Sequence, residues 1–130
     1  MRDTHQHLPK PTEVELELLR VLWDKDAATV RELFEVVSQQ RALGYTSVLK
    51  TLQIMTEKGL VERTEAGKAH IYRAVASQEE TQDQLLRDLS TRLFAGSAAQ
   101  LAMHALAMEP ASAEGLEEIR RIIRQKKERQ

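Results

Sequence analysis

The sequence contains no cysteine, and none of its apolar runs approaches the length of a membrane span. Without cysteine, the chain can form neither a disulfide framework nor a thiolate metal site, which is typical of a cytoplasmic protein. A membrane-spanning helix needs about 18 consecutive apolar residues, so no membrane insertion is expected. Residues 1–12 are polar and lack the apolar core of a signal peptide, so none is expected there.

The motifs of common enzyme classes are also absent. The sequence has no GxSxG elbow, HExxH zinc motif, P-loop or dinucleotide fingerprint. Glu57, Glu62 and Glu65 occur close together, but no histidine or nucleophile is arranged with them. His5 and His7 have a metal-capable spacing, yet no ligand partners are fixed beside them. We therefore predict that the protein is not an enzyme and needs no metal or cofactor.

The 130 residues suffice for one domain and an extension, and their charge is unevenly distributed. Residues 1–39 hold 5 basic against 8 acidic side chains, and residues 77–130 hold 8 against 9. Residues 40–76 hold 6 against 3, a net charge of +3. A surface that contacts nucleic-acid phosphates is therefore expected in this middle segment.

Capping boxes and apolar periodicity predict three helices in the first half of the chain. TEVE at residues 12–15 and TVRE at residues 29–32 each place Thr at the N-cap and Glu three positions later. Gly59 suits the left-handed position that follows a helix. The predicted helices span about residues 13–24, 30–40 and 46–58.

A hairpin is predicted directly after the third helix. Residues 60–64 and 69–75 are strand-like and are joined around Ala66-Gly67. Alternate side chains of the second strand can pack on one face and meet solvent or phosphate on the other. Helix, glycine stop and hairpin in this order are typical of a winged helix-turn-helix, which places a helix in the DNA major groove. The predicted fold class is mainly α with a small β wing.

The outer face of the third helix carries side chains suited to contacting DNA. At 100° per residue, Val48, Leu52 and Met55 fall together and are expected in the core. Opposite them, hydroxyls can bond phosphates or base edges, and long polar side chains can reach base acceptors. A solvated polar face is the alternative. The candidate DNA contacts on this helix are Tyr45, Thr46, Ser47, Lys50 and Gln53.

Basic side chains also occur on both strands of the hairpin and near its tip. Such groups are placed for phosphate contact beside the groove. For any one of them a solvated position explains the sequence equally well, but their place directly after the helix favours DNA binding. These hairpin candidates are Arg63, Lys68, His70 and Arg73.

The second half predicts three more amphipathic helices, broken at Gly96-Ser97 and around Pro110. The middle one is polar only at Gln100 and His104, so it needs burial on most sides. A symmetric partner would supply that cover, and a dimer suits paired DNA half-sites. Three helices closing on themselves is the alternative. The predicted dimerisation residues are Leu86, Leu89, Leu93, Leu101, Ala105, Leu116, Ile119 and Ile123.

The chain resembles the penicillinase-repressor family (BlaI/MecI/CopY) of winged-helix repressors. The matching segments are PTEVELELLRVLW, TVRELFEVVS, YTSVLKTLQIMTEKGLVER and GKAHIYRAV, with weaker matches in LFAGSAAQLAMHAL and GLEEIRRII. The resemblance implies a homodimeric repressor that binds a palindromic operator in double-stranded DNA. We expect a tail at residues 1–11, a DNA-binding domain at 12–76 and a dimerisation domain at 77–130. A winged helix used only for protein interaction or assembly is the alternative.

Three departures from the family pattern limit what the resemblance implies. Ile54 stands where many members carry Arg. The family's beta-lactam repressors are cut by a membrane metalloprotease sensor at an Asn-Phe bond, which makes such a sensor a candidate partner. The aligned pair here is His104-Ala105, so cleavage at that bond does not carry over. Without cysteine, the metal hook of the copper-responsive branch is excluded.

Overall fold

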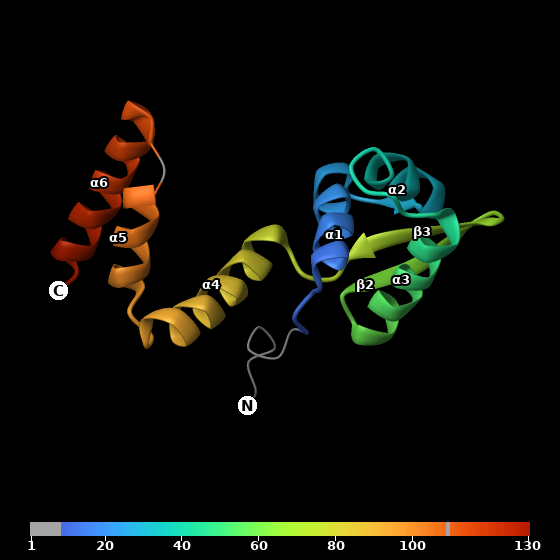
Figure 1. Ribbon diagram of the computed structural model, residues 1–130, viewed down its shortest axis with the longest axis horizontal. Coiled ribbons are helices and arrows are strands. Elements are labelled where there is room, and N and C mark those ends of the chain that lie inside the picture. Colours follow the sequence, from blue (N-terminus) through green and yellow to red (C-terminus); the bar gives the residue numbers. More distant parts are fainter. Residues whose placement is uncertain (1–8, 109) are drawn as a thin grey trace. The chain divides into compact units, whose positions relative to one another are not determined.

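The computed structural model describes residues 9–108 and 110–130 (Figure 1). The tail expected at residues 1–11 lies mostly outside these ranges, as do His5 and His7. The predicted fold class is confirmed, because six helices accompany one small antiparallel sheet in the described residues. The elements are α1 (Glu13–Lys25), β1 (Ala28–Thr29), α2 (Val30–Val37), α3 (Tyr45–Lys58), β2 (Val61–Ala66), β3 (Ala69–Ala74), α4 (Gln78–Phe94), α5 (Ala98–Met108) and α6 (Ala113–Glu128).

The chain divides into two compact units, Met1–Leu86 and Arg87–Gln130, and the division falls inside α4. The boundary predicted at residues 76/77 lies earlier in the chain than this division, and it stays a prediction. No helix in the part of the chain that the structure describes is long and apolar enough to cross a membrane.

Local sequence signals set the ends of the first three helices. At α1, the Thr12 N–H donates to Glu15 Oε1 at 2.8 Å, and the Glu15 N–H donates to Thr12 Oγ1 at 3.3 Å. Thr29 and Glu32 repeat this capping box at α2, with distances of 2.8 and 3.2 Å. Gly59 follows α3 in the left-handed conformation, with φ of 82°, as predicted.

The core lies between α1, α2, α3 and the inner face of the sheet. Val48, Leu52 and Met55 are fully buried, which confirms the predicted inward face of α3. Tyr72 of β3 is buried among them, at 1% exposure. The other buried hydrophobic residues of this core are Leu18, Leu19, Leu22, Ala28, Val30, Leu33, Val37, Leu60 and Val61.

The sequence prediction missed one strand and placed the end of one helix too late. The sheet has three strands in the order β1-β3-β2, because Ala28 and Thr29 pair with Tyr72 and Ile71. A strand of only two residues is too short to show the alternation of apolar and polar side chains that identifies a strand in a sequence. Only its pairing with β3 reveals it. The second helix ends at Val37 rather than near Gln40, since the N–H groups of Gln39 and Gln40 bond to carbonyls three residues earlier, as in a 3₁₀ turn.

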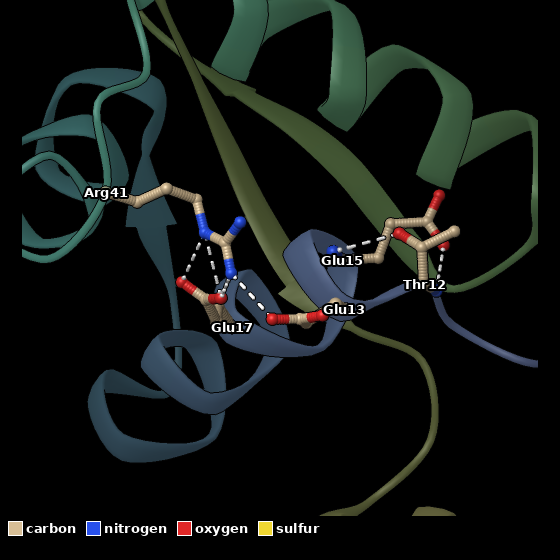
Figure 2. A network of polar contacts seen from close by, with 5 residues as sticks. All are labelled: Thr12, Glu13, Glu15, Glu17 and Arg41. Atoms are coloured by element: carbon tan, nitrogen blue, oxygen red, sulfur yellow. Dashed lines mark hydrogen bonds and ion pairs between the residues drawn. The ribbon is translucent and has the colours of Figure 1, made fainter.

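An ion-pair network holds the turn between α2 and α3 against α1 (Figure 2). Arg41, in that turn, donates from Nε to Glu17 Oε2 at 3.1 Å and from Nη2 to Glu13 Oε1 at 2.9 Å. The hydrogen bonds that Arg41 donates to Glu17 and, with a smaller effect, to Glu13 raise the pKa of Arg41 above its ordinary value. The turn that leads into α3 is therefore fixed on a neighbouring helix.

A second contact holds the far end of α3. Glu15 is 3% exposed, and its Oε1 accepts from Lys58 Nζ at 2.7 Å as well as from the Thr12 N–H. Burial disfavours the charged carboxylate, but the hydrogen bonds from Lys58 and Thr12 outweigh burial and lower the pKa of Glu15. One buried carboxylate thus joins the start of α1 to the end of α3.

We predict that Lys58→Met destabilises the protein by about 1–3 kcal/mol at neutral pH, because it leaves the buried Glu15 carboxylate without its cation. A lowered pKa contributes stability above the ordinary value of 4.5, and this is lost as the pH falls through the folded value. The difference between parent and variant should therefore shrink on acidification. Urea unfolding between neutral and acidic pH measures both effects.

Lys50→Met is the matched control, because Lys50 is an exposed lysine of the same helix. It should leave the free energy of unfolding nearly unchanged. Equal stability of Lys58→Met and Lys50→Met at neutral pH would contradict the role given to Glu15.

Candidate nucleic-acid interface

Because one face of α3 packs in the core, its opposite face points outward. All five side chains predicted to contact DNA from this helix are exposed in the described structure. Ile54 lies on the same side, is 42% exposed and adds no polar group. The face therefore offers hydroxyls, an amide and a cation to a ligand, with one aliphatic side chain among them. The five predicted residues are Tyr45, Thr46, Ser47, Lys50 and Gln53.

Tyr45, the first residue of α3, is held in place from α2. Its ring meets Phe34 edge-on, with centroids 5.7 Å apart, and Arg31 Cζ lies 5.6 Å from the Tyr45 ring centroid. Sequence reasoning missed Arg31. The available signal was its spacing, because Arg31 and Phe34 are three residues apart on α2 and so share a face.

The wing lies beside α3. Figure 1 shows β2 returning alongside α3 and the hairpin tip projecting beyond the start of that helix. Ala66 pairs with Ala69, which leaves a two-residue turn of Gly67 and Lys68. Gly67 has φ of 63°, as a tight hairpin turn requires. Lys68 therefore stands at the tip of the wing, at the end where α3 begins.

The strand register divides the hairpin candidates between two faces. Directly opposed residues share a face, so Arg63 lies on the face of Tyr72, which packs toward the helices. Arg63 also lines an open groove between α3 and β2 together with Gln53. Arg73 is opposite Glu62 and lies on the other face. The structure thus brings Arg63, but not Arg73, to the α3 side of the wing.

His70 shares the face of Arg63 and is opposite Glu65. The His70 Nε2 atom lies 3.9 Å from Glu65 Oε1. A cation at this position would be partly compensated by the neighbouring carboxylate, so His70 offers less net positive charge than Lys68 or Arg63.

The middle segment is less positive in effect than its sequence indicates. Two of its six cations, Arg41 and Lys58, are paired with acids of α1. Among the described residues, the other four cations have no ion-pair partner: Lys50, Arg63, Lys68 and Arg73. Uncompensated positive charge therefore remains on the outer face of α3 and on the wing, where it can attract a polyanion.

The described residues hold no group of three or more His, Asp or Glu side chains that could bind a metal ion. The interface likewise shows no pairing of a nucleophile with a base.

The second unit has a different character. None of the side chains of α5 or α6 that the structure describes is buried. Leu93 is 66% exposed and Ile123 is 48% exposed, and Phe94 contacts His104 with ring centroids 5.1 Å apart. Of the predicted dimerisation residues, Leu101 and Ile119 are half-buried, while the others are exposed: Leu86, Leu89, Leu93, Ala105, Leu116 and Ile123. Exposed apolar surface of this kind is typical of interaction sites.

Comparison with protein families finds a match over most of the chain. A family model described as penicillinase repressor matches residues 11–125. Transcriptional regulator BlaI of Mycobacterium tuberculosis is 33% identical over 69 residues, which cover 52% of this chain and 50% of that protein. The chain therefore aligns with about half the length of this curated relative. Methicillin resistance regulatory protein MecI of Mammaliicoccus sciuri is 20% identical over 112 residues, which cover 86% of this chain and 91% of that protein.

Solved structures support the fold. The solution structure of the DNA-binding domain of the repressor BlaI has a TM-score of 0.51 and 18% identity, and covers 62% of this chain and 93% of that chain. The solution structure of Bacillus licheniformis BlaI, in monomeric form with the blaP half-operator, has a TM-score of 0.50 and 18% identity. The latter match covers 56% of this chain and 89% of that chain. At this identity the similarity concerns the fold alone.

Proposed function

The chain belongs to the penicillinase repressor family, and from this membership we propose that it is a sequence-specific transcriptional repressor that binds operator DNA as a homodimer. The observation that carries the proposal is the clustering of uncompensated charge. The polar face of α3 carries Lys50, and the adjacent wing carries Arg63 and Lys68. By contrast, Arg41 and Lys58 are paired with acids of α1. This distribution suits a helix placed in the major groove with a wing on the backbone.

The relatives support DNA as the partner. Bacillus licheniformis BlaI was solved with the blaP half-operator, and the mycobacterial and Mammaliicoccus relatives are regulatory proteins by name. A repressor of this kind acts in the cytoplasm, where the operator is. A membrane metalloprotease sensor that inactivates the repressor is a further proposed partner, drawn from the family resemblance.

Within α3, base reading is assigned to the residues that face away from the core. Lys50 can donate to the O6 and N7 acceptors of guanine, and Gln53 can pair with the N6 and N7 atoms of adenine. Thr46 and Ser47, in the first turn, suit phosphates or base edges at close approach.

Dimerisation is assigned to the second unit. A lone chain would leave Leu93, Ile123 and their neighbours partly in water, and so would forgo part of the about 1.5–3 kcal/mol that fully burying an aliphatic side chain contributes. A second copy supplies the same surface with two-fold symmetry, which also presents two α3 helices to a palindrome.

For α3 we predict that Lys50→Ala or Thr46→Ala weakens operator binding by about 1–3 kcal/mol, with a smaller effect on random DNA, because a lost base contact affects only the correct sequence. A band shift with DNA from upstream of the gene, compared with a scrambled duplex, measures the difference. If a variant loses the same binding free energy on both duplexes, the replaced residue contacts the DNA backbone and does not read a base. If the parent itself binds upstream DNA no better than scrambled DNA, the assembly-module alternative is favoured.

For the wing we predict that Arg63→Ala and Lys68→Ala weaken specific and nonspecific binding together. Each should make the slope of log K against log salt shallower by about one, because each releases one phosphate contact. Arg73→Ala is the control within the hairpin and should change both quantities less, since Arg73 lies on the far face. If all three variants keep the parent's affinity and slope, the wing is not a DNA contact.

For the second unit we predict a dimer at micromolar concentration, and a shift to monomer in Leu93→Glu and Ile123→Glu. A buried charge at a two-fold interface faces its own copy, which makes association unfavourable. Val75→Glu is the control, because Val75 is 51% exposed but belongs to the first unit. Sedimentation equilibrium distinguishes the states, and a monomeric parent would refute the assignment.

A further inference from the structure

Arg31 is a cation outside the segment that charge and motif analysis single out. It lies near the start of α2, is exposed, and has no ion-pair partner among the described residues, although Glu35 follows one turn later on the same helix. Instead, its guanidinium lies over the ring of Tyr45, with Cζ 5.6 Å from the centroid. This is a cation–π geometry, in which the guanidinium keeps its charge.

The aromatic platform under Arg31 is itself fixed. Tyr45 meets Phe34 edge-on at 5.7 Å and 72°, so α2 supplies both the cation and one support of the ring. A guanidinium held by stacking retains N–H donors along its edge, and this fork matches two phosphate oxygens. Because Tyr45 is the first residue of α3, the guanidinium lies at the start of that helix, whose next residues are Thr46 and Ser47.

We propose that Arg31 binds a DNA phosphate beside the first turn of α3, and that Tyr45 is the residue that positions it. The inference rests on the proposed DNA-binding function and adds a backbone contact from α2 to those from α3 and the wing. Tyr45 then acts mainly through its ring, rather than through its hydroxyl.

The test uses the full chain and a labelled duplex of mixed sequence, with anisotropy measured over a series of salt concentrations. Arg31→Ala should bind roughly three- to tenfold more weakly, with a slope of log K against log salt shallower by about one. Arg31→Lys should keep the slope of the parent, because its charge remains. Arg20→Ala is the matched control, since Arg20 is an exposed arginine of α1 that lines a groove with the far end of α2. It should behave like the parent.

The role of Tyr45 is tested separately. Tyr45→Ala should bind several-fold more weakly than Tyr45→Phe, which keeps the ring. The salt slope of Tyr45→Ala should equal that of the parent, because the cation remains but is no longer held. Circular dichroism on heating confirms that each variant is folded.

Two outcomes would overturn the inference, and they are distinguishable. If the parent binds the duplex and Arg31→Ala keeps its affinity and slope, Arg31 only covers the tyrosine ring and the DNA-binding function stands. If the parent binds no duplex at all, the proposed function fails and the Arg31 site fails with it.

Discussion

The orientation of α3 depends on the buried carboxylate of Glu15. This group accepts from Lys58 at the end of α3 and from the Thr12 N–H at the start of α1, so two helix ends share one oxygen atom. Arg41 fixes the other end of α3 through Glu13 and Glu17. A helix that reads bases must keep its angle to the rest of the domain. Even a small rotation of the helix displaces the ends of its side chains by a distance comparable to a hydrogen bond. Packing of Val48, Leu52 and Met55 in the core determines which face of α3 points outward, and the ion pairs hold the two ends of this helix.

The same ion pairs limit which cations of this chain, whose net charge is −1, contribute to a positive surface. Acids of α1 pair with Arg41 and Lys58, which removes these cations from the charge that a ligand meets. The cations of residues 40–76 that remain uncompensated lie on α3 (Lys50) and on the wing (Arg63, Lys68 and Arg73). Net charge describes solubility and long-range attraction, whereas binding depends on where unpaired charge lies.

The two units divide their roles by surface chemistry. The first buries most of its large apolar side chains and exposes polar and basic ones, whereas the second leaves much of its apolar surface in water within a single chain. That contrast supports separate assignments to DNA binding and to dimerisation. Symmetric pairing through the second unit would couple oligomerisation to recognition, because two half-sites contribute their binding free energies to one complex.

Short-range signals in the sequence determined the helices, the hairpin and the inward face of α3. Capping boxes, Gly59 and apolar periodicity act within a few residues, so they can be read without a fold. Family membership was likewise legible from motif order. Tertiary structure alone decided β1, the separate faces of Arg63 and Arg73, and the stacking of Arg31 on Tyr45. It also decided that Lys58 pairs with Glu15, 43 residues away. Strand register and long-range pairing depend on how elements meet in space, which local sequence does not encode.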